Sequence, residues 1–149
     1  MSVVKSKRTQ SSIEFEKIYF NVANGVDNLV EHNFYADGDL LERNRVFLDI
    51  RCRSLEELTD TLLYHIKIAN SIYPTCMTEW EERRTYIGKA IGTCYAILTH
   101  YQRIMMRLRI PDNKYVSYIT DIERMINSLK AWRKSGNKIK TTLENKGNI

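Results

Sequence analysis

Between residues 87 and 108 the chain repeats apolar side chains at alternating intervals of four and three. The repeat comprises Ile87, Ile91, Cys94, Leu98, Tyr101, Met105 and Leu108, and it is flanked every seven residues by Ala90, Ile97 and Ile104. A sustained seven-residue repeat favours left-handed packing of long helices around a shared core. No segment shows the alternating pattern of a β-strand, so the sequence predicts an all-α fold.

Capping boxes, prolines and glycines divide the rest of the chain into three more helical segments. The first predicted helix is residues 12–33, opened by a Ser11-x-x-Glu14 box, and the second is residues 39–73, opened by an Asp39-x-x-Glu42 box and stopped by Pro74. The third is the repeat segment, opened by a Thr78-x-x-Glu81 box and stopped by Pro111. The fourth is residues 112–134, with a stop at Gly136. Short connections place consecutive helices antiparallel. The predicted architecture is therefore an antiparallel up-down-up-down four-helix bundle.

A chain of 149 residues is expected to form one domain. We assign the bundle to residues 12–136, a basic flexible tail to residues 1–11 and a polar mobile tail to residues 137–149. No apolar run has the length of a membrane span, and the N-terminus lacks the apolar segment of a signal peptide. These features predict a cytoplasmic protein without a membrane partner.

Positive charge is concentrated in three stretches. Residues 1–11 carry three cations and no acid, residues 130–149 carry six cations against Glu144 alone, and residues 83–111 carry six cations and no acid. Because the net charge of the whole chain is only +5, the remainder is slightly acidic. Charge segregated in this way predicts an anionic partner such as nucleic acid.

The stretch LKAWRKSGNK, residues 129–138, has two interpretations. Cations in the last turn of a helix offset the partial negative charge of its carbonyls, each contributing about 0.3–1 kcal/mol. Contact with a polyanion would also explain the lysines beyond the predicted helix end. We expect both roles, with one group of cations at each end of the bundle. The predicted nucleic-acid-binding residues are Arg83, Arg84, Arg103, Arg107, Arg109, Lys130, Arg133, Lys134, Lys138 and Lys140.

No arrangement of residues predicts catalysis or metal binding. His32, His65 and His100 lack a His or Cys partner at helical spacing, and the sequence has no glycine-rich phosphate loop and no nucleophile elbow. His65 lies on the apolar side of its helix, where a hydrogen-bonded core histidine is expected. The three cysteines have no metal-ligand spacing and are expected to be free, buried thiols. The chain is therefore predicted to be non-enzymatic, with no cofactor and no metal.

Small residues recur every four positions on one stripe of the third helix. A glycine inside a helix costs about 1 kcal/mol relative to alanine, so two on one stripe indicate the close approach of another backbone. That backbone belongs either to the same chain or to a second subunit. Arg51 is likewise either paired with an acid of its own chain or part of a subunit contact. The predicted oligomer interface comprises Gly88, Gly92, Ala96 and Arg51.

Four stretches of the sequence resemble one known family. They are SIEFEKIYFNVANGVDNLVEH, YHIKIANSIYP, EERRTYIGKAIGTCYAILTHYQ and NKYVSYITDIERMINSLKAWRKSGNK, and they cover about residues 11–138. The family is that of the bacterial four-helix-bundle proteins encoded in intervening sequences of 23S ribosomal RNA. The closest likeness is to the accessory variability determinant (Avd) proteins of diversity-generating retroelements. Ala131 and Gly136 stand where that family is expected to have glycine and an acid.

The resemblance implies a non-enzymatic partner of a retroelement reverse transcriptase. Relatives form a homopentameric barrel whose positive surface binds nucleic acid and the reverse transcriptase, and together they support error-prone copying of a template RNA. The implied partners are therefore RNA or an RNA/DNA hybrid, a reverse transcriptase and further copies of the chain. The basic positions that match the family are Arg83, Arg84, Lys130, Arg133, Lys134 and Lys138.

Two other interpretations stay open. One is a stand-alone relative of the ribosomal-RNA insertion proteins that has no reverse transcriptase partner. The other is a structural bundle whose cations only cap helices and aid solubility. The sequence does not distinguish the first of these from a retroelement protein.

Overall fold

The computed structural model describes residues 5–147, with their side chains from Glu14 onward. These residues form helices and no strand, which confirms the predicted all-α class. Four of the helices are long, and a short helix and two single helical turns lie in their connections. In chain order the elements are α1 Lys5–Glu31, η1 Asn33–Tyr35, α2 Gly38–Arg43, α3 Arg45–Ser71, α4 Met77–Leu108, η2 Asp112–Lys114 and α5 Val116–Gly147.

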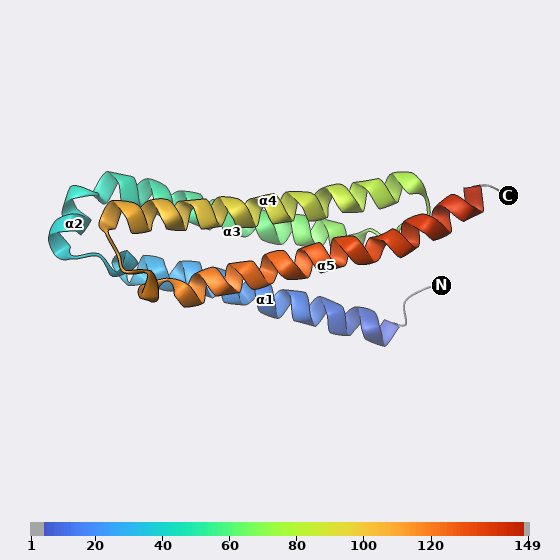
Figure 1. The fold of residues 1–149 in the computed structure, drawn as a ribbon, viewed down its shortest axis with the longest axis horizontal. Helices are drawn as coiled ribbons and strands as arrows, with labels where there is room; N and C mark the ends of the chain where they lie inside the picture. The colour runs from blue at the N-terminus through green and yellow to red at the C-terminus, as the bar shows by residue number, and fades with distance from the viewer. Residues whose placement is uncertain (1–4, 148–149) are drawn as a thin grey trace.

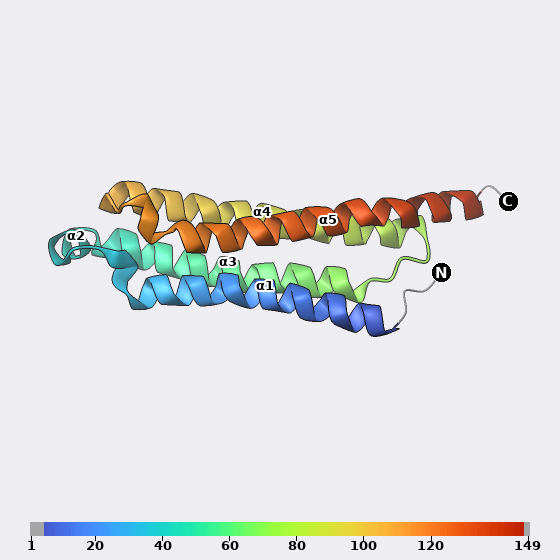
Figure 2. The same cartoon turned by 60° about the horizontal axis from the view of Figure 1, so that its bottom comes forward.

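The four long helices lie side by side along the long axis of the molecule (Figures 1 and 2). α3 packs against α4, α4 against α5, α5 against α1, and α1 against α3. One end of the molecule, the α2 end, holds α2, the last turn of α4 and η2. The opposite end, called the terminal end below, holds the connection between α3 and α4, the start of α1 and the end of α5. There α5 projects beyond α4 (Figure 2).

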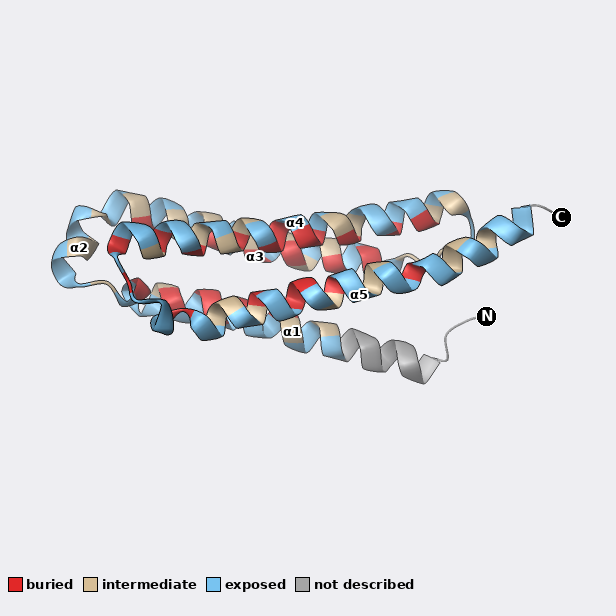
Figure 3. Ribbon diagram, in the orientation of Figure 1, coloured by how far each residue is buried: buried red, intermediate tan, exposed pale blue. Residues whose placement is uncertain are grey.

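The seven-residue repeat of α4 lies in the core, as predicted. Ile87, Ile91, Cys94, Tyr101 and Leu108 are buried, and so are the three flanking residues Ala90, Ile97 and Ile104. Leu98 and Met105 are half-buried against the same core. Figure 3 shows buried positions on all four long helices, on the sides that meet their neighbours. Burial of each large aliphatic side chain contributes about 1.5–3 kcal/mol, so this repeat is a main source of stability.

The predicted second helix, residues 39–73, is two helices that meet at Asn44. The backbone of Asn44 leaves the helical region at φ −110° and ψ 18°, and its side-chain amide donates a hydrogen bond to the carbonyl oxygen of Leu40 at 2.8 Å. Such side-chain bonds compete with regular helix, so the chain bends there.

The first helix also differs from the prediction, because it starts at Lys5 instead of near residue 12. The lysines, arginine and glutamine of residues 5–10 favour helix and account for the earlier start.

α4 starts next to the predicted Thr78-x-x-Glu81 box, but a different acid caps it. The carboxylate of Glu79 accepts hydrogen bonds from the backbone N–H and the hydroxyl of Thr75 and from the thiol of Cys76. The bonds from Thr75 are the main cause that lowers the pKa of Glu79. The expected box is therefore wrong in register, although an acid in the first turn still stabilises the helix.

α5 continues past the predicted stop at Gly136 and ends at Gly147. Gly136 is buried, and its carbonyl oxygen accepts a hydrogen bond from the indole Nε1–H of Trp80 at 2.8 Å. A methyl group at Gly136 would lie 3.5 Å from Trp80 Nε1 and from Arg83 Nη2. Those distances are ordinary van der Waals contacts. Gly136 lies inside α5 at its contact with α4 and does not terminate the helix, so that prediction is wrong. Residues 137–147, expected as a tail, are helical.

The chain passes from α1 to α2 through three consecutive residues in the left-handed region. Asn33, Phe34 and Tyr35 have φ angles of 52°, 57° and 61°, which cost L-amino acids roughly 1–2 kcal/mol each. Phe34 is buried, and its carbonyl oxygen accepts a hydrogen bond from the hydroxyl of Tyr115 at 3.1 Å. The hydroxyl of Tyr35 lies 3.0 Å from that of Tyr118. Contacts with residues 115–118 therefore hold this turn.

Candidate nucleic-acid interface

At the terminal end, basic side chains from two helices lie against a tryptophan of α4. Trp80 is buried, and the guanidinium of Arg84 and the ammonium of Lys140 lie 5.4 Å and 5.3 Å from its ring centre. Arg83 is also buried, with its guanidinium carbon 5.9 Å from the ring centre of Trp132. Cations over aromatic faces are held by the ring quadrupole. These five residues form the Trp80 cluster, which joins α4 to α5.

Arg83 is the most enclosed cation of the Trp80 cluster. Burial lowers the pKa of its guanidinium, and Tyr73 opposes that effect. A guanidinium nevertheless stays charged in proteins, so the cluster holds a positive charge in a partly apolar setting. Lys140 forms an ion pair with Glu144, with 3.8 Å between Nζ and Oε1 and both side chains exposed. Such a surface pair contributes at most about 1 kcal/mol.

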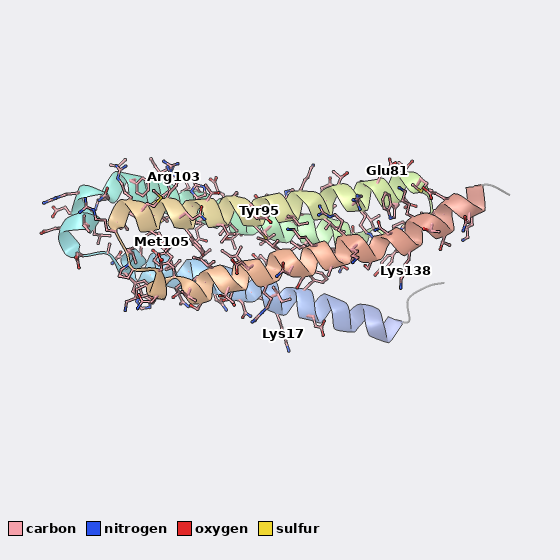
Figure 4. The ribbon with its side chains drawn as sticks, in the orientation of Figure 1. Lys17, Glu81, Tyr95, Arg103, Met105 and Lys138 are labelled. Carbon is pink, nitrogen blue, oxygen red and sulfur yellow. The ribbon has the colours of Figure 1, made fainter. Side chains whose placement is uncertain are left out.

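The other cations predicted for this region lie in different settings. Arg133 is half-buried and lines a small cleft together with Arg83 and Trp132. Lys134 and Lys138 are exposed, and their ammonium groups make no hydrogen bond or ion pair with the described part of the chain. Figure 4 shows Lys138 toward the terminal end and Arg103 toward the α2 end. The terminal end therefore presents both anchored and free positive side chains.

Lys130 lies apart from the Trp80 cluster. Its ammonium donates a hydrogen bond to the hydroxyl of Tyr95 at 3.0 Å and lies 5.6 Å from the centre of that ring. Tyr95 is 46% exposed and lies near the middle of α4 (Figure 4). Lys130 therefore links α5 to α4 on the outer surface instead of joining the other cations of LKAWRKSGNK.

At the α2 end, basic side chains surround one phenylalanine of α3. The guanidinium carbons of Arg51, Arg107 and Arg103 lie 4.9, 4.9 and 5.9 Å from the ring centre of Phe47. Arg107 Nε donates a hydrogen bond to Oδ1 of Asn44 at 3.0 Å. With His100, which contacts Arg51, these residues form the Phe47 cluster: Asn44, Phe47, Arg51, His100, Arg103 and Arg107. Arg109, the left-handed C-cap of α4 (φ 54°), is exposed nearby in sequence and contacts none of them.

Arg51 contacts a histidine and not an acid. Its Nη1 lies 3.2 Å from Nδ1 of His100, and its Nε is buried without a hydrogen-bond partner among the described residues. Because a guanidinium only donates, His100 must accept at Nδ1 and is neutral in this arrangement. Burial, followed by the charges of Arg51 and Arg103, lowers the pKa of His100. Of the two alternatives for Arg51, a pair with an acid of its own chain is therefore not found among the described residues.

Direct ion pairs are scarce in the part of the chain that the structure describes. Two are present, Lys67 with Glu16 at 3.4 Å and Lys140 with Glu144. Of the ten cations predicted to bind nucleic acid, Lys140 alone has an acid partner. Apart from Lys140, the predicted basic side chains at both ends are thus not paired with acids among the described residues.

The stripe of small residues on α4 faces open space. Methyl groups at Gly88 or Gly92 would meet nothing within 4 Å, and Gly92 is exposed. Ala96 is half-buried on the same stripe. Close packing within the chain therefore does not explain these glycines, whereas Gly25 does have such a contact. A methyl group at Gly25 would lie 2.9 Å from Cδ1 of Tyr118.

The structure assigns roles to residues that sequence reasoning passed over. The basic side chains of the two clusters contact three such residues: Trp80 in the first cluster, and Phe47 and His100 in the second. For Trp80 a signal existed, because it lies three and four positions before Arg83 and Arg84, on the same face of a helix. Phe47 and His100 likewise lie four and three positions before Arg51 and Arg103, but their contacts across the two helices depend on how α3 and α4 are placed against each other.

Two expectations about single side chains need correction. Nδ1 of His65 is buried without a hydrogen-bond partner among the described residues, so His65 is not the hydrogen-bonded core histidine that was expected. The cysteines are free, but Cys94 alone is fully buried, while Cys52 is half-buried and Cys76 is exposed. Cys76 lies outside the core because it precedes α4 in the connection from α3.

No protein-family model matches this chain, and neither curated proteins nor solved structures provide a match. The family resemblance therefore rests on the four quoted stretches. Within residues 5–147, no helix combines the length and the apolar character needed to cross a membrane.

Proposed function

We propose that this chain is a non-enzymatic accessory protein of a diversity-generating retroelement. It forms a basic homo-oligomer, a pentamer, that binds RNA or an RNA/DNA hybrid together with the cognate reverse transcriptase in the cytoplasm. In this role it supports mutagenic copying of template RNA. The proposal includes an antiparallel up-down-up-down four-helix bundle as the protomer, which is supported by the pairwise contacts of the four long helices.

The observation that carries the proposal is the shortage of acid partners around the basic side chains. Nine of the ten predicted cations form no ion pair within the described chain. Lys134 and Lys138 are exposed as well, so phosphate groups can reach them. Five copies of a chain with a net charge of +5 would strengthen the attraction for a polyanion further.

Filter binding of single-stranded RNA across a series of salt concentrations tests this function. Each phosphate contact should contribute about −0.7 to the slope of log affinity against log salt concentration. The double variant Arg133→Ala plus Lys134→Ala should melt near the wild-type temperature and bind RNA more weakly. Absence of binding at low salt, or a response independent of salt, would contradict the proposal.

A structural role for the cations is the second candidate, and specific contacts favour it. Lys130 bonds to Tyr95, and the arginines of the Phe47 cluster connect α3 to α4. If the cations serve only as such links, the double variant lowers the melting temperature modestly and leaves RNA association unchanged. The remaining alternative is a stand-alone relative of the ribosomal-RNA insertion proteins. Its gene would not lie beside a reverse transcriptase gene with template and variable repeats, so the neighbouring genes distinguish it from a retroelement protein.

Light scattering tests the assembly. A particle near the chain mass of 17.6 kDa would rule out the pentamer, whereas a mass five times larger supports it. Because Gly92 faces open space, its replacement by tryptophan should reduce the mass of the particle while the helix content of the chain is retained. An unchanged mass in a Gly92→Trp variant would place the subunit interface elsewhere.

A further inference from the structure

The Phe47 cluster concentrates positive charge from two helices in a small space. Three guanidinium carbons lie within 6 Å of the ring centre of Phe47. Arg103 and Arg107 of α4 are exposed, while Arg51 of α3 is half-buried. The cluster is therefore open to solvent on one side and anchored by an aromatic ring on the other.

No acid offsets these charges. None of the three arginines forms an ion pair within the described chain. Burial lowers the pKa of the Arg51 guanidinium, and the positive charge of Arg103 lowers it further. His100 is an acceptor from Arg51 and adds no negative charge. Like charges are thus held close together, and this mutual repulsion would be relieved by a bound anion.

The dipole of α4 does not account for this arrangement. Its effect is confined to the last turn, where Arg107 lies. Arg103 lies before that turn, and Arg51 belongs to a different helix. Stabilisation of the end of α4 therefore explains Arg107 alone and does not account for the positions of Arg51 and Arg103.

We infer that the Phe47 cluster is a binding site for backbone phosphates of single-stranded RNA, with Arg51 and Arg103 as its principal ligands. Guanidinium groups donate two parallel hydrogen bonds to phosphate oxygens. The exposed guanidinium of Arg103, which lies over the same ring as that of Arg51, marks the side from which a phosphate would approach. This inference rests on the proposed function and assigns one site to it.

A carboxylate from a second copy of the chain is the competing occupant. It would bring one negative charge to a cluster of three arginines. Successive phosphates of an RNA strand bring several charges, which suits three guanidinium groups gathered around one ring on α3 and α4. The charge balance therefore favours RNA.

Binding of fluorescein-labelled oligouridylate to the full chain tests the site. The variants are Arg51→Gln and Arg103→Gln, and Arg124→Gln is the matched control, because Arg124 is exposed on α5 outside the Phe47 cluster. We expect each cluster variant to weaken binding about ten-fold and the control to weaken it less than two-fold, since charge-assisted bonds are lost only in the cluster. A morpholino oligomer of the same sequence, which has an uncharged backbone, should bind neither wild type nor variants.

Stability and mass measurements complete the test. Because Arg103 repels Arg51, the Arg103→Gln variant should keep or raise the melting temperature while it binds RNA less well. Equal RNA affinity of the Arg103→Gln and Arg124→Gln variants overturns the site and leaves RNA binding intact. A smaller particle mass for Arg51→Gln overturns it in favour of a subunit contact. Absence of RNA binding by the wild-type chain removes both the site and the proposed function.

Discussion

Alanine substitutions at two glycines of long helices should have opposite effects on stability. Gly25 in α1 is buried against Tyr118 of α5, whereas Gly92 in α4 faces open space. Both sites gain the same local benefit from alanine, about 1 kcal/mol of helix propensity. The difference between the two variants therefore measures packing alone.

The structure sets the size of each effect. At Gly92 the new methyl group meets nothing within 4 Å, so the full gain of about 1 kcal/mol should appear. At Gly25 the methyl group would lie 2.9 Å from Cδ1 of Tyr118, which must move. Overpacking of this kind costs about 1–3 kcal/mol, so the net loss should reach about 2 kcal/mol. For a chain of this length 1 kcal/mol shifts the melting temperature by about 2–4 °C.

Thermal unfolding followed by circular dichroism is the appropriate assay, with Gly88→Ala as the control because Gly88 also faces open space. The melting temperature should rise for Gly92→Ala and Gly88→Ala and fall for Gly25→Ala. A rise for Gly25→Ala would show that α1 and α5 are not in close contact at Tyr118. A loss for Gly92→Ala in monomeric protein would refute the open environment of the stripe.

Three further outcomes follow from single side chains. Trp80→Phe removes the hydrogen bond to the Gly136 carbonyl and should lower the free energy of unfolding by about 1 kcal/mol in urea titrations; an unchanged midpoint would argue against this contact. Burial and Lys89 lower the pKa of His65, so the unfolded chain binds more protons below about pH 6.5 and the wild type should lose stability there. A His65→Gln variant should lose less over the same range, and equal losses would exclude His65 as the cause. Burial raises the pKa of Cys94 to about 12, so iodoacetamide should modify it only after unfolding, as mass spectrometry of the digested protein can show.

The core of α4 could be predicted because its pattern is local. Ile87, Ile97 and Ile104 repeat along one helix, and a helix with one apolar side must bury that side. Hydrophobic periodicity was therefore sufficient to predict which residues are inside.

Features that depend on contacts between helices could not be predicted. Gly136 was expected to end a helix, but its role is decided by Trp80, which lies far away in the sequence. The basic residues were identified by composition, and the spacing of four residues places Phe47 beside Arg51 on one helix, but nothing in the sequence places Arg51 beside His100. Those neighbours depend on the relative placement of α3 and α4, which periodicity within one helix does not determine.

The left-handed turn between α1 and α2 has a consequence for folding kinetics. The turn is unfavourable by itself, and the bonds that hold it come from residues more than eighty positions later in the chain. Contacts of such large sequence separation form slowly, because a long loop must close first. We therefore expect α3 and α4 to pair early and α1 to take its final place only after α5 has docked.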